Sequence, residues 1–288
     1  FDRDAVDLDV QHMSYFFPFG HSYDMFEDTQ SWVRHGSARG LTMIEQDDRL
    51  YGLGSADMKS FFALAIEAIR SIDTGKLQQP LIILATADEE SSMDGARALV
   101  ELGRPSARYA VIGEPTGLKP VNAHKGIMME AIHLLGRSGH SSDPDYGINA
   151  LEGMHKIIGE LMAWRNELQE QYRNPEFRVP YPTLNLGHIH GGDNPNRICG
   201  ECELHIDLRL LPGMDLETVR TTLRERLERV MSNKGLKLDI RPLFSGAPAM
   251  HTDRTTEIVL AAETLTGHSA ETVAFGTEGP FLNQMGME

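Results

Sequence analysis

The period of apolar positions changes near residue 126, and this change predicts two kinds of structure. Over 58–69 apolar side chains recur at helical spacing. Two short apolar runs without alternation follow, over 81–87 and 109–113. Such runs are typical of strands buried on both faces, as in a parallel sheet. A helix is predicted between them, over roughly 94–102, and the order strand, helix, strand predicts an α/β domain.

Beyond residue 126 the pattern alternates strands of period two with amphipathic helices. The segment ECELHIDLRL, 201–210, places an apolar residue at every second position, which is typical of a half-buried antiparallel strand. Helices are predicted over about 149–171 and after an N-cap at Asp215, the second with Gly235 past its end. Further strands are predicted in MMEAIHLLGRSG, TLNLGHIH and KLDIRPL. The order β-α-β-β-α-β indicates an antiparallel sheet covered by two helices.

These patterns together predict an α/β protein with an insertion. A catalytic domain, with a mostly parallel sheet flanked by helices, is expected over 1–126 and 244–288, and we expect it to be truncated at both ends. An α+β domain with an antiparallel sheet and two helices is expected between its halves, over 127–243.

Composition excludes several classes of function. The formal net charge is -15 and the pI about 5.2, which disfavours nucleic acid and anionic membranes as partners. No apolar run approaches the roughly 18 residues of a membrane span. The two cysteines, Cys199 and Cys202, give no disulfide framework and fit a reducing, cytoplasmic location.

Side chains of the kind that bind metals follow the ends of the predicted strands. His21 follows YFFPFG, Glu114 follows YAVIG, and LIILATA runs into three consecutive acids that include Glu89 and Glu90. Asp57 follows Gly-Leu-Gly and precedes the first predicted helix. Because ligands collect at the carboxyl ends of strands in α/β sheets, these side chains are expected to converge.

A divalent cation would offset such a cluster of carboxylates. The expected donors are one imidazole and several carboxylates without a thiolate, which suits Zn, Mn or Co. Neighbouring side chains point in different directions, so one of Glu89 and Glu90 can bind a metal while the other acts on water as general base. The alternative is that these acids cap helices or solvate loops.

Several other residues carry weaker signals, each with an ordinary structural alternative. His140, in a predicted loop after a strand, is either a surface histidine or an oxyanion stabiliser. Arg209 has the fork that suits a substrate carboxylate, although an arginine on an open sheet face is commonly just solvated. Cys199 and Cys202 have C-x-x-C spacing, but without a second pair we interpret it as incidental.

Several longer motifs, in order along the chain, carry a resemblance to a known family. They are YGLGSADMKS, LATADEESS, IGEPTGLKPVNAHKG, GRSGHSSDP, YPTLNLGHIHGGDNPNRIC and ELHIDLRLLPGMD. They resemble the co-catalytic zinc peptidases and deacylases, and most specifically the acetylornithine deacetylase family within them. The resemblance implies hydrolysis of N-acetyl-L-ornithine to L-ornithine and acetate in arginine biosynthesis, by a homodimer holding two divalent metal ions, Zn or Co.

The resemblance also implies a role for each residue of the metal site. Asp57 would bridge two metals, His21 and Glu114 would complete one site, and Glu90 would serve the other. Glu89 would be the general base.

In the inserted domain, over 127–243, the resemblance implies lid and dimerisation functions. His140 would reach a partner's active site and stabilise the oxyanion there. Asn196 and Arg209 would help to hold the carboxylate and backbone of the substrate.

The chain departs from the family pattern at two places. The family's first motif is His-x-Asp, whereas Tyr23 stands at the expected Asp position and Asp24 follows one residue later. The family's final metal-binding His is expected beyond Glu288. The alternatives left open are a deacylase of another acyl amino acid, such as N-succinyl-diaminopimelate or N-acetylcitrulline, and a catalytically impaired dimerising homologue or fragment.

Overall fold

A computed structural model describes residues 43–232 and 235–288. The chain divides into two compact units. The described part of the first comprises 43–87 and Gly113–Pro115, and the second comprises Asp88–Ile112 and Thr116–Glu288. Within these described ranges no helix has both the length and the apolarity needed to cross a membrane.

The first unit begins with a hairpin and a helix. Strands β1 (Ile44–Gln46) and β2 (Arg49–Tyr51) pair antiparallel. The two residues between them, Asp47 and Asp48, have φ of 53° and 56°, as a type I′ hairpin turn requires. Helix α2 (Lys59–Ser71) matches the predicted helix, although none of its residues is buried, and the 3-10 turn η3 (Thr74–Lys76) follows.

The two predicted parallel strands are not formed, which corrects that part of the sequence prediction. The run 81–87 has no regular secondary structure, and Leu81 and Ile82 are 57% and 47% exposed. In the run 109–113, Ala110 shares one backbone hydrogen bond with Glu288, but no strand forms. A strand needs a partner strand for its backbone groups, and neither run has one among the described residues.

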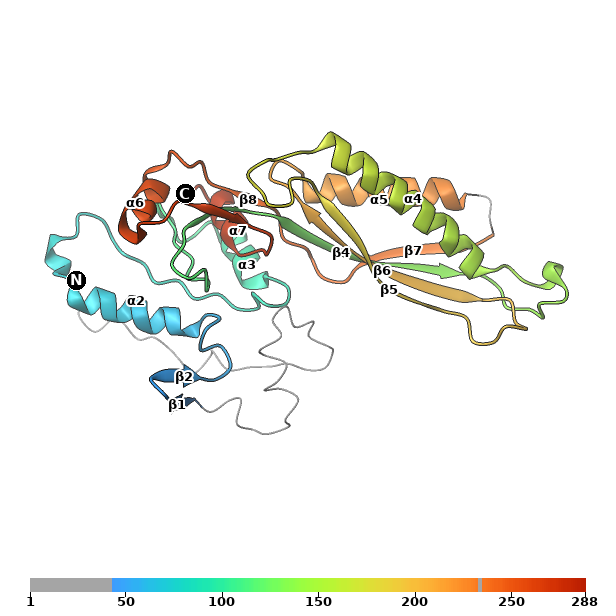
Figure 1. Ribbon diagram of the computed structural model, residues 1–288, viewed down its shortest axis with the longest axis horizontal. Coiled ribbons are helices and arrows are strands. Elements are labelled where there is room, and N and C mark those ends of the chain that lie inside the picture. Colours follow the sequence, from blue (N-terminus) through green and yellow to red (C-terminus); the bar gives the residue numbers. More distant parts are fainter. Residues whose placement is uncertain (1–42, 233–234) are drawn as a thin grey trace. The chain divides into compact units, whose positions relative to one another are not determined.

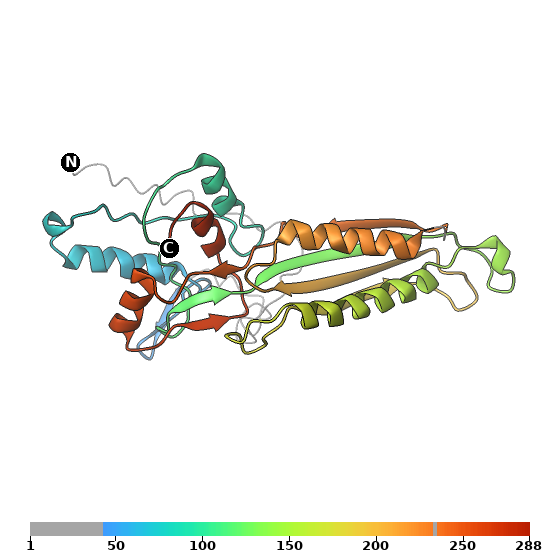
Figure 2. The same cartoon turned by 90° about the horizontal axis from the view of Figure 1, so that it is seen from above.

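The second unit is built around a four-stranded sheet (Figures 1 and 2). Its strands are β4 (Gly126–Leu135), β5 (Thr183–Gly191), β6 (Glu201–Leu210) and β7 (Lys237–Pro242). The order across the sheet is β5-β6-β4-β7, and every neighbouring pair is antiparallel. The predicted antiparallel sheet is therefore confirmed.

Two helices, α4 (Ala150–Gln171) and α5 (Leu216–Met231), cover one face of this sheet (Figure 2). The Asn149 side chain caps α4 by accepting from the backbone N–H of Leu151. The Asp215 side chain caps α5 by accepting from the N–H of Thr218. The predicted N-cap at Asp215 is confirmed, and α4 begins directly after Asn149, the predicted start of the first helix.

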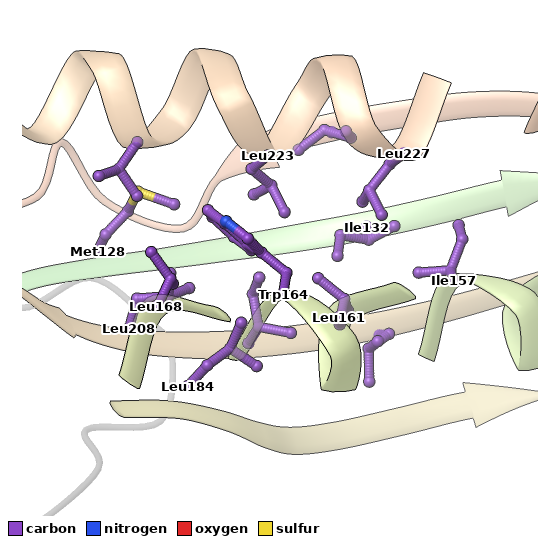
Figure 3. Packing of buried hydrophobic residues seen from close by; sticks show 14 of the residues in the cluster. Met128, Ile132, Ile157, Leu161, Trp164, Leu168, Leu184, Leu208, Leu223 and Leu227 are labelled. Carbon is purple, nitrogen blue, oxygen red and sulfur yellow. The ribbon is translucent and has the colours of Figure 1, made fainter. Parts of the chain in front are cut away.

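The core lies between these helices and the sheet (Figure 3). Along β6 every second side chain is almost completely buried: Cys202, Leu204, Ile206, Leu208 and Leu210. From α4 and α5 the core receives Ile157, Leu161, Trp164, Leu223 and Leu227. Each such apolar side chain contributes about 1.5–3 kcal/mol by leaving water. The alternation in the sequence thus identifies the face that stabilises the domain.

A smaller three-stranded sheet also belongs to the second unit. It consists of β3 (Val121–His124), β8 (Met250–His251) and β9 (Glu271–Val273), in the order β8-β3-β9. Strand β3 pairs antiparallel with β8 and parallel with β9. The remaining helices of the unit are α3 (Asp94–Leu102), α6 (Glu257–Thr266), α7 (Gly279–Gln284) and the 3-10 turn η4 (Pro144–Tyr146).

Candidate active site

The acidic run after residue 87 forms a tight turn that leads into α3. Asp88 has a φ of 63°, and its carbonyl oxygen accepts hydrogen bonds from the backbone N–H groups of Ser91, Ser92 and Met93, at 3.2, 3.0 and 2.7 Å. The backbone of Asp88 thus organises the turn. Glu89, half-buried, and Glu90, exposed, are adjacent residues on this fixed backbone.

Two further candidate ligands belong to the first unit. Asp57 is exposed and lies two residues before α2, and its peptide bond to Met58 is cis. Glu114 is half-buried. Because Glu89 and Glu90 belong to the other unit, the arrangement of these carboxylates around a shared ion stays a prediction.

The remaining predicted metal ligand, His21, lies outside the described residues, as do Tyr23 and Asp24. Within the part of the chain that the structure describes, no three Asp, Glu, His or Cys side chains form a metal site. The donor types still fit the group that the resemblance implies. Carboxylate oxygens together with one imidazole suit Zn²⁺ or Co²⁺.

The two thiols are part of the hydrophobic core of the inserted domain. Both Cys199 and Cys202 are buried and free. The Cys199 thiol donates to the carbonyl oxygen of Glu201 at 3.0 Å. Burial, with a further contribution from Cys199, raises the pKa of Cys202 to about 11. A thiol with so high a pKa is a poor metal ligand or nucleophile, which agrees with the interpretation of C-x-x-C as incidental.

His140 and Asn196, two of the predicted site residues, lie together at one end of the large sheet. His140 forms an antiparallel bridge with Arg197, and the N–H of Ser141 donates to the carbonyl of Asn196 at 2.9 Å. A shallow surface hollow is lined by Ser138, Gly139, His140, Asn196 and Arg197. The pairing of two loop segments therefore builds one polar hollow.

The hydrogen bonds of His140 indicate which ring nitrogen carries the proton. Its Nδ1 accepts from the backbone N–H of Ser142 at 3.3 Å and lies 2.8 Å from the Ser142 hydroxyl. A backbone N–H can only donate, so Nδ1 is the acceptor and the neutral ring carries its hydrogen on Nε2. The exposed Nε2–H is then available to a developing oxyanion.

Arg209, the third predicted site residue of this domain, lies at the other end of β6. Its Nε donates to both carboxylate oxygens of Asp207, at 3.0 and 3.1 Å. The Arg209 side chain is 16% exposed. The carboxylate orients the guanidinium and leaves its two Nη groups directed away from that pairing.

Sequence reasoning did not single out Lys125, whose ammonium group is repelled by the positive charge of Arg209. Lys125 is 2% exposed, and its ammonium donates to the carbonyl oxygen of Tyr181 at 2.7 Å. Burial and then the positive charge of Arg209 lower the pKa of Lys125 to about 8. The only signal in the sequence was its position in the motif NAHKG, just before a strand with a buried face.

The length of β6 separates the two groups of predicted substrate residues. The strand pairs Leu135 with Glu201 near the His140 hollow, and Ile127 with Arg209 at the far end. Eight residues of extended chain span roughly 26 Å at about 3.3 Å per residue. One small substrate therefore cannot contact both His140 and Arg209 of the same chain.

Comparison with solved structures identifies the fold. An aminopeptidase PepT from Bacillus cereus ATCC 10987 has a TM-score of 0.64 at 21% identity, over 85% of this chain and 65% of that one. A tripeptidase from Staphylococcus aureus has a TM-score of 0.60 at 22% identity, over 85% of this chain and 66% of that one. The chain shares the peptidase fold of these proteins.

Comparison of sequences identifies the family. A family model described as a peptidase dimerisation domain matches residues 122–234. The acetylornithine deacetylase of Edwardsiella ictaluri is 48% identical over 266 residues, which cover 92% of this chain and 68% of the relative. That of Aliivibrio fischeri strain MJ11 is 49% identical, over 92% of this chain and 69% of the relative. The chain belongs to the acetylornithine deacetylase family.

Proposed function

We propose that the protein is a metal-dependent amidohydrolase that converts N-acetyl-L-ornithine into L-ornithine and acetate, in the cytoplasm, as a step of arginine biosynthesis. The observation that carries this proposal is identity of 48% over 92% of the chain to an acetylornithine deacetylase. Buried free thiols support a reducing compartment.

The metal-binding residues are proposed from the motifs and from their donor chemistry. Asp57 would bridge two divalent ions, His21 and Glu114 would complete one site, and Glu90 would serve the other. Bound Zn or Co would polarise the amide carbonyl and lower the pKa of a water molecule. We propose the catalytic domain over 1–126 and 244–288 as the part that holds them.

Glu89 is the proposed general base. It would take a proton from the attacking water and deliver it to the leaving amine. Its place beside Glu90, on the turn fixed by the Asp88 carbonyl, supports this division of roles, because adjacent side chains diverge from a shared backbone.

The inserted domain, 127–243, would supply the groups that hold the substrate. The Nε2–H of His140 would donate to the oxyanion as the carbonyl carbon becomes tetrahedral. Asn196, in the same hollow, would donate to the substrate backbone. Arg209 would bind the substrate carboxylate through its Nη groups.

A homodimer is proposed because these residues lie too far apart in one chain. Since β6 separates the His140 hollow from Arg209 by roughly 26 Å, the two can serve one substrate only if they come from different chains. The dimerisation domain matched over 122–234 supports this arrangement. His140 and Asn196 would then enter the active site of the partner subunit.

The test compares Glu89→Ala with Asp88→Asn. We expect Glu89→Ala to lower turnover of N-acetyl-L-ornithine by about 10²–10⁴-fold, while elemental analysis finds the same metal content as in the wild type. Asp88→Asn is the matched control, because Asn also accepts a positive φ and leaves the turn in place. Unchanged turnover in Glu89→Ala would contradict the role of Glu89.

A substrate panel completes the test of the wild-type protein. N-succinyl-diaminopimelate and N-acetylcitrulline are compared with N-acetyl-L-ornithine at equal concentration. A higher kcat/KM for either of the first two would replace the proposed substrate. Absence of turnover together with a metal content below two ions per chain would identify a catalytically impaired homologue.

A further inference from the structure

We propose that His188 and His205 form an accessory site that chelates a divalent transition-metal cation on the sheet face opposite α4 and α5. The site uses none of the proposed catalytic ligands, so it goes beyond the proposed function. Imidazole nitrogens suit Cu²⁺, Ni²⁺ and Zn²⁺, whereas Mg²⁺ and Ca²⁺ require oxygen ligands. A strand irregularity, the separation of the two rings and the hydrogen bonds of His205 support this site.

A β-bulge in β5 brings His188 opposite His205. Leu186 pairs with Ile206, whereas His188 pairs with His205, so β5 has one extra residue between these two pairs. Regular antiparallel pairing would place His188 opposite Leu204, which is directed towards the helices. The bulge therefore moves the His188 side chain to the open face of the sheet, beside His205.

The separation of the two rings fits a shared cation. Their centroids lie 4.8 Å apart, and their planes are tilted by 37°. With metal–nitrogen bonds of about 2.0–2.1 Å and angles of about 90–110° at the metal, two imidazoles on one cation have centroids roughly 4.5–5.1 Å apart. The backbone of β5 and β6 thus already holds the rings at this spacing, and binding requires only side-chain rotation.

The hydrogen bonds of His205 leave one of its nitrogens ready to bind a metal. Its Nε2 lies 2.7 Å from Glu203 Oε1. An ionised carboxylate can only accept, so Nε2 carries the hydrogen and Nδ1 of the neutral ring has the lone pair. Arg241 Nη2 donates to Glu203 Oε2 at 3.0 Å and so fixes this carboxylate. A histidine that donates to a carboxylate through one nitrogen and binds the ion through the other is the usual arrangement in metal sites.

The His188 ring is also available as a ligand. It is exposed, and within the part of the chain that the structure describes its contact is the ring of His205. No third side chain of the ligand type completes the site among residues 43–232 and 235–288. Water or a small ligand would fill the other coordination positions, which makes this an open site.

The probe is the Cu²⁺ complex of iminodiacetate, which leaves room at the metal for two further ligands and therefore selects paired imidazoles. The full chain is loaded with Zn²⁺ beforehand, so that the proposed catalytic ligands are occupied. Electron paramagnetic resonance should then show one Cu²⁺ per chain with the hyperfine splitting of two coordinated imidazoles.

Four variants assign the site. His188→Ala and His205→Ala should each weaken binding by about 10²-fold, because chelation by two ligands exceeds binding by either alone. Glu203→Ala should weaken it about tenfold, since the acceptor that orients His205 is lost. His155→Ala, which removes an exposed histidine of α4, is the matched control and should leave binding unchanged.

A wild-type spectrum with fewer than two imidazoles, or binding that His188→Ala and His205→Ala leave intact, would overturn the proposal. An equal loss in His155→Ala would also overturn it, because any exposed histidine would then suffice. Should His205→Ala fail to fold, His205→Gln keeps a donor for Glu203 without the imidazole and carries the same expectation. Deacylase turnover is not the readout, so the failure of this site and the failure of the proposed function are distinguishable.

Discussion

The Nε2 atom of His124 accepts a hydrogen bond of 3.2 Å from the backbone N–H of Thr277. On the other side of the ring, Nδ1–H donates to the carbonyl of Lys125 at 2.9 Å. One nitrogen therefore accepts and the other donates, which only a neutral imidazole can do. The completely buried ring links β3 to the segment before α7.

This linkage predicts an acid-sensitive stability. Burial lowers the pKa of His124 from 6.5 to about 4, so between these values the unfolded chain binds a proton that the folded chain does not. The free energy of unfolding should therefore fall as pH is lowered from 6.5 towards 4, by up to about 3 kcal/mol from this residue. Urea unfolding at several pH values measures it. His124→Gln should show a smaller decrease over that range; an equal decrease would contradict the prediction.

The buried ion pair between β4 and α5 gives a second prediction. Arg220 Nε donates to Glu130 Oε1 at 2.8 Å, and the Glu130 side chain is 1% exposed. Arg220→Met would leave a buried carboxylate without its cation and should cost about 3–5 kcal/mol in unfolding free energy. The double variant Glu130→Leu with Arg220→Met should recover most of that loss. A double variant as unstable as Arg220→Met would show that packing, not charge, dominates.

Two glycines should respond oppositely to alanine. A Cβ on Gly126 would lie 2.8 Å from the Ala249 nitrogen and 2.9 Å from the Ala247 carbonyl oxygen, which are backbone atoms that cannot move aside. We expect Gly126→Ala to destabilise the protein by about 2–4 kcal/mol. Gly159 lies in α4 with nothing within 4 Å of an added Cβ, so Gly159→Ala should stabilise by about 0.5–1 kcal/mol. Thermal unfolding of both variants tests the pair.

Mixing two inactive variants tests whether His140 acts across the proposed dimer. His140→Ala and Glu89→Ala should each be nearly inactive alone. After unfolding and refolding together, each mixed dimer would contain one site with Glu89 from its own chain and His140 from the partner. With random pairing the mixture should recover roughly a quarter of wild-type activity. No recovery, with mixed dimers demonstrated by size and mass, would place His140 in its own chain's site.

The inserted domain could be predicted because its signals are local. In β6 alternate residues such as Leu204 and Ile206 carry the burial pattern directly. The helix caps Asn149 and Asp215 stand one residue before their helices. These features depend on neighbours in sequence, so one chain suffices to recognise them.

The strands outside the inserted domain could not be predicted in this way, because they depend on pairing between segments that are distant in sequence. The run 81–87 is as apolar as a buried strand, but apolarity does not supply a partner for its backbone. The strands β8 and β9 have two and three residues, too short for any pattern of period two. They form only because β3 lies between them.

In the candidate site, too, local motifs could be recognised from the sequence, whereas contacts between distant segments could not. His140 and Asn196 stood out by motif, but their common hollow results from the pairing of β4 with β6, which continues as a backbone hydrogen bond from Gly136 to Gly200. Lys125 was missed because lysine usually remains exposed. Its burial depends on the Tyr181 carbonyl, 56 residues away.

Ile127 and Ala247 exchange two backbone hydrogen bonds, of 2.8 and 2.9 Å, where the chain enters and leaves the large sheet. The segment between them therefore begins and ends at one place. A short linker could join residues 126 and 248 after its removal, and the excised segment, which carries its own core, is expected to fold alone. Because its two ends meet, the segment is an insertion that the surrounding chain can carry without a change in its own path.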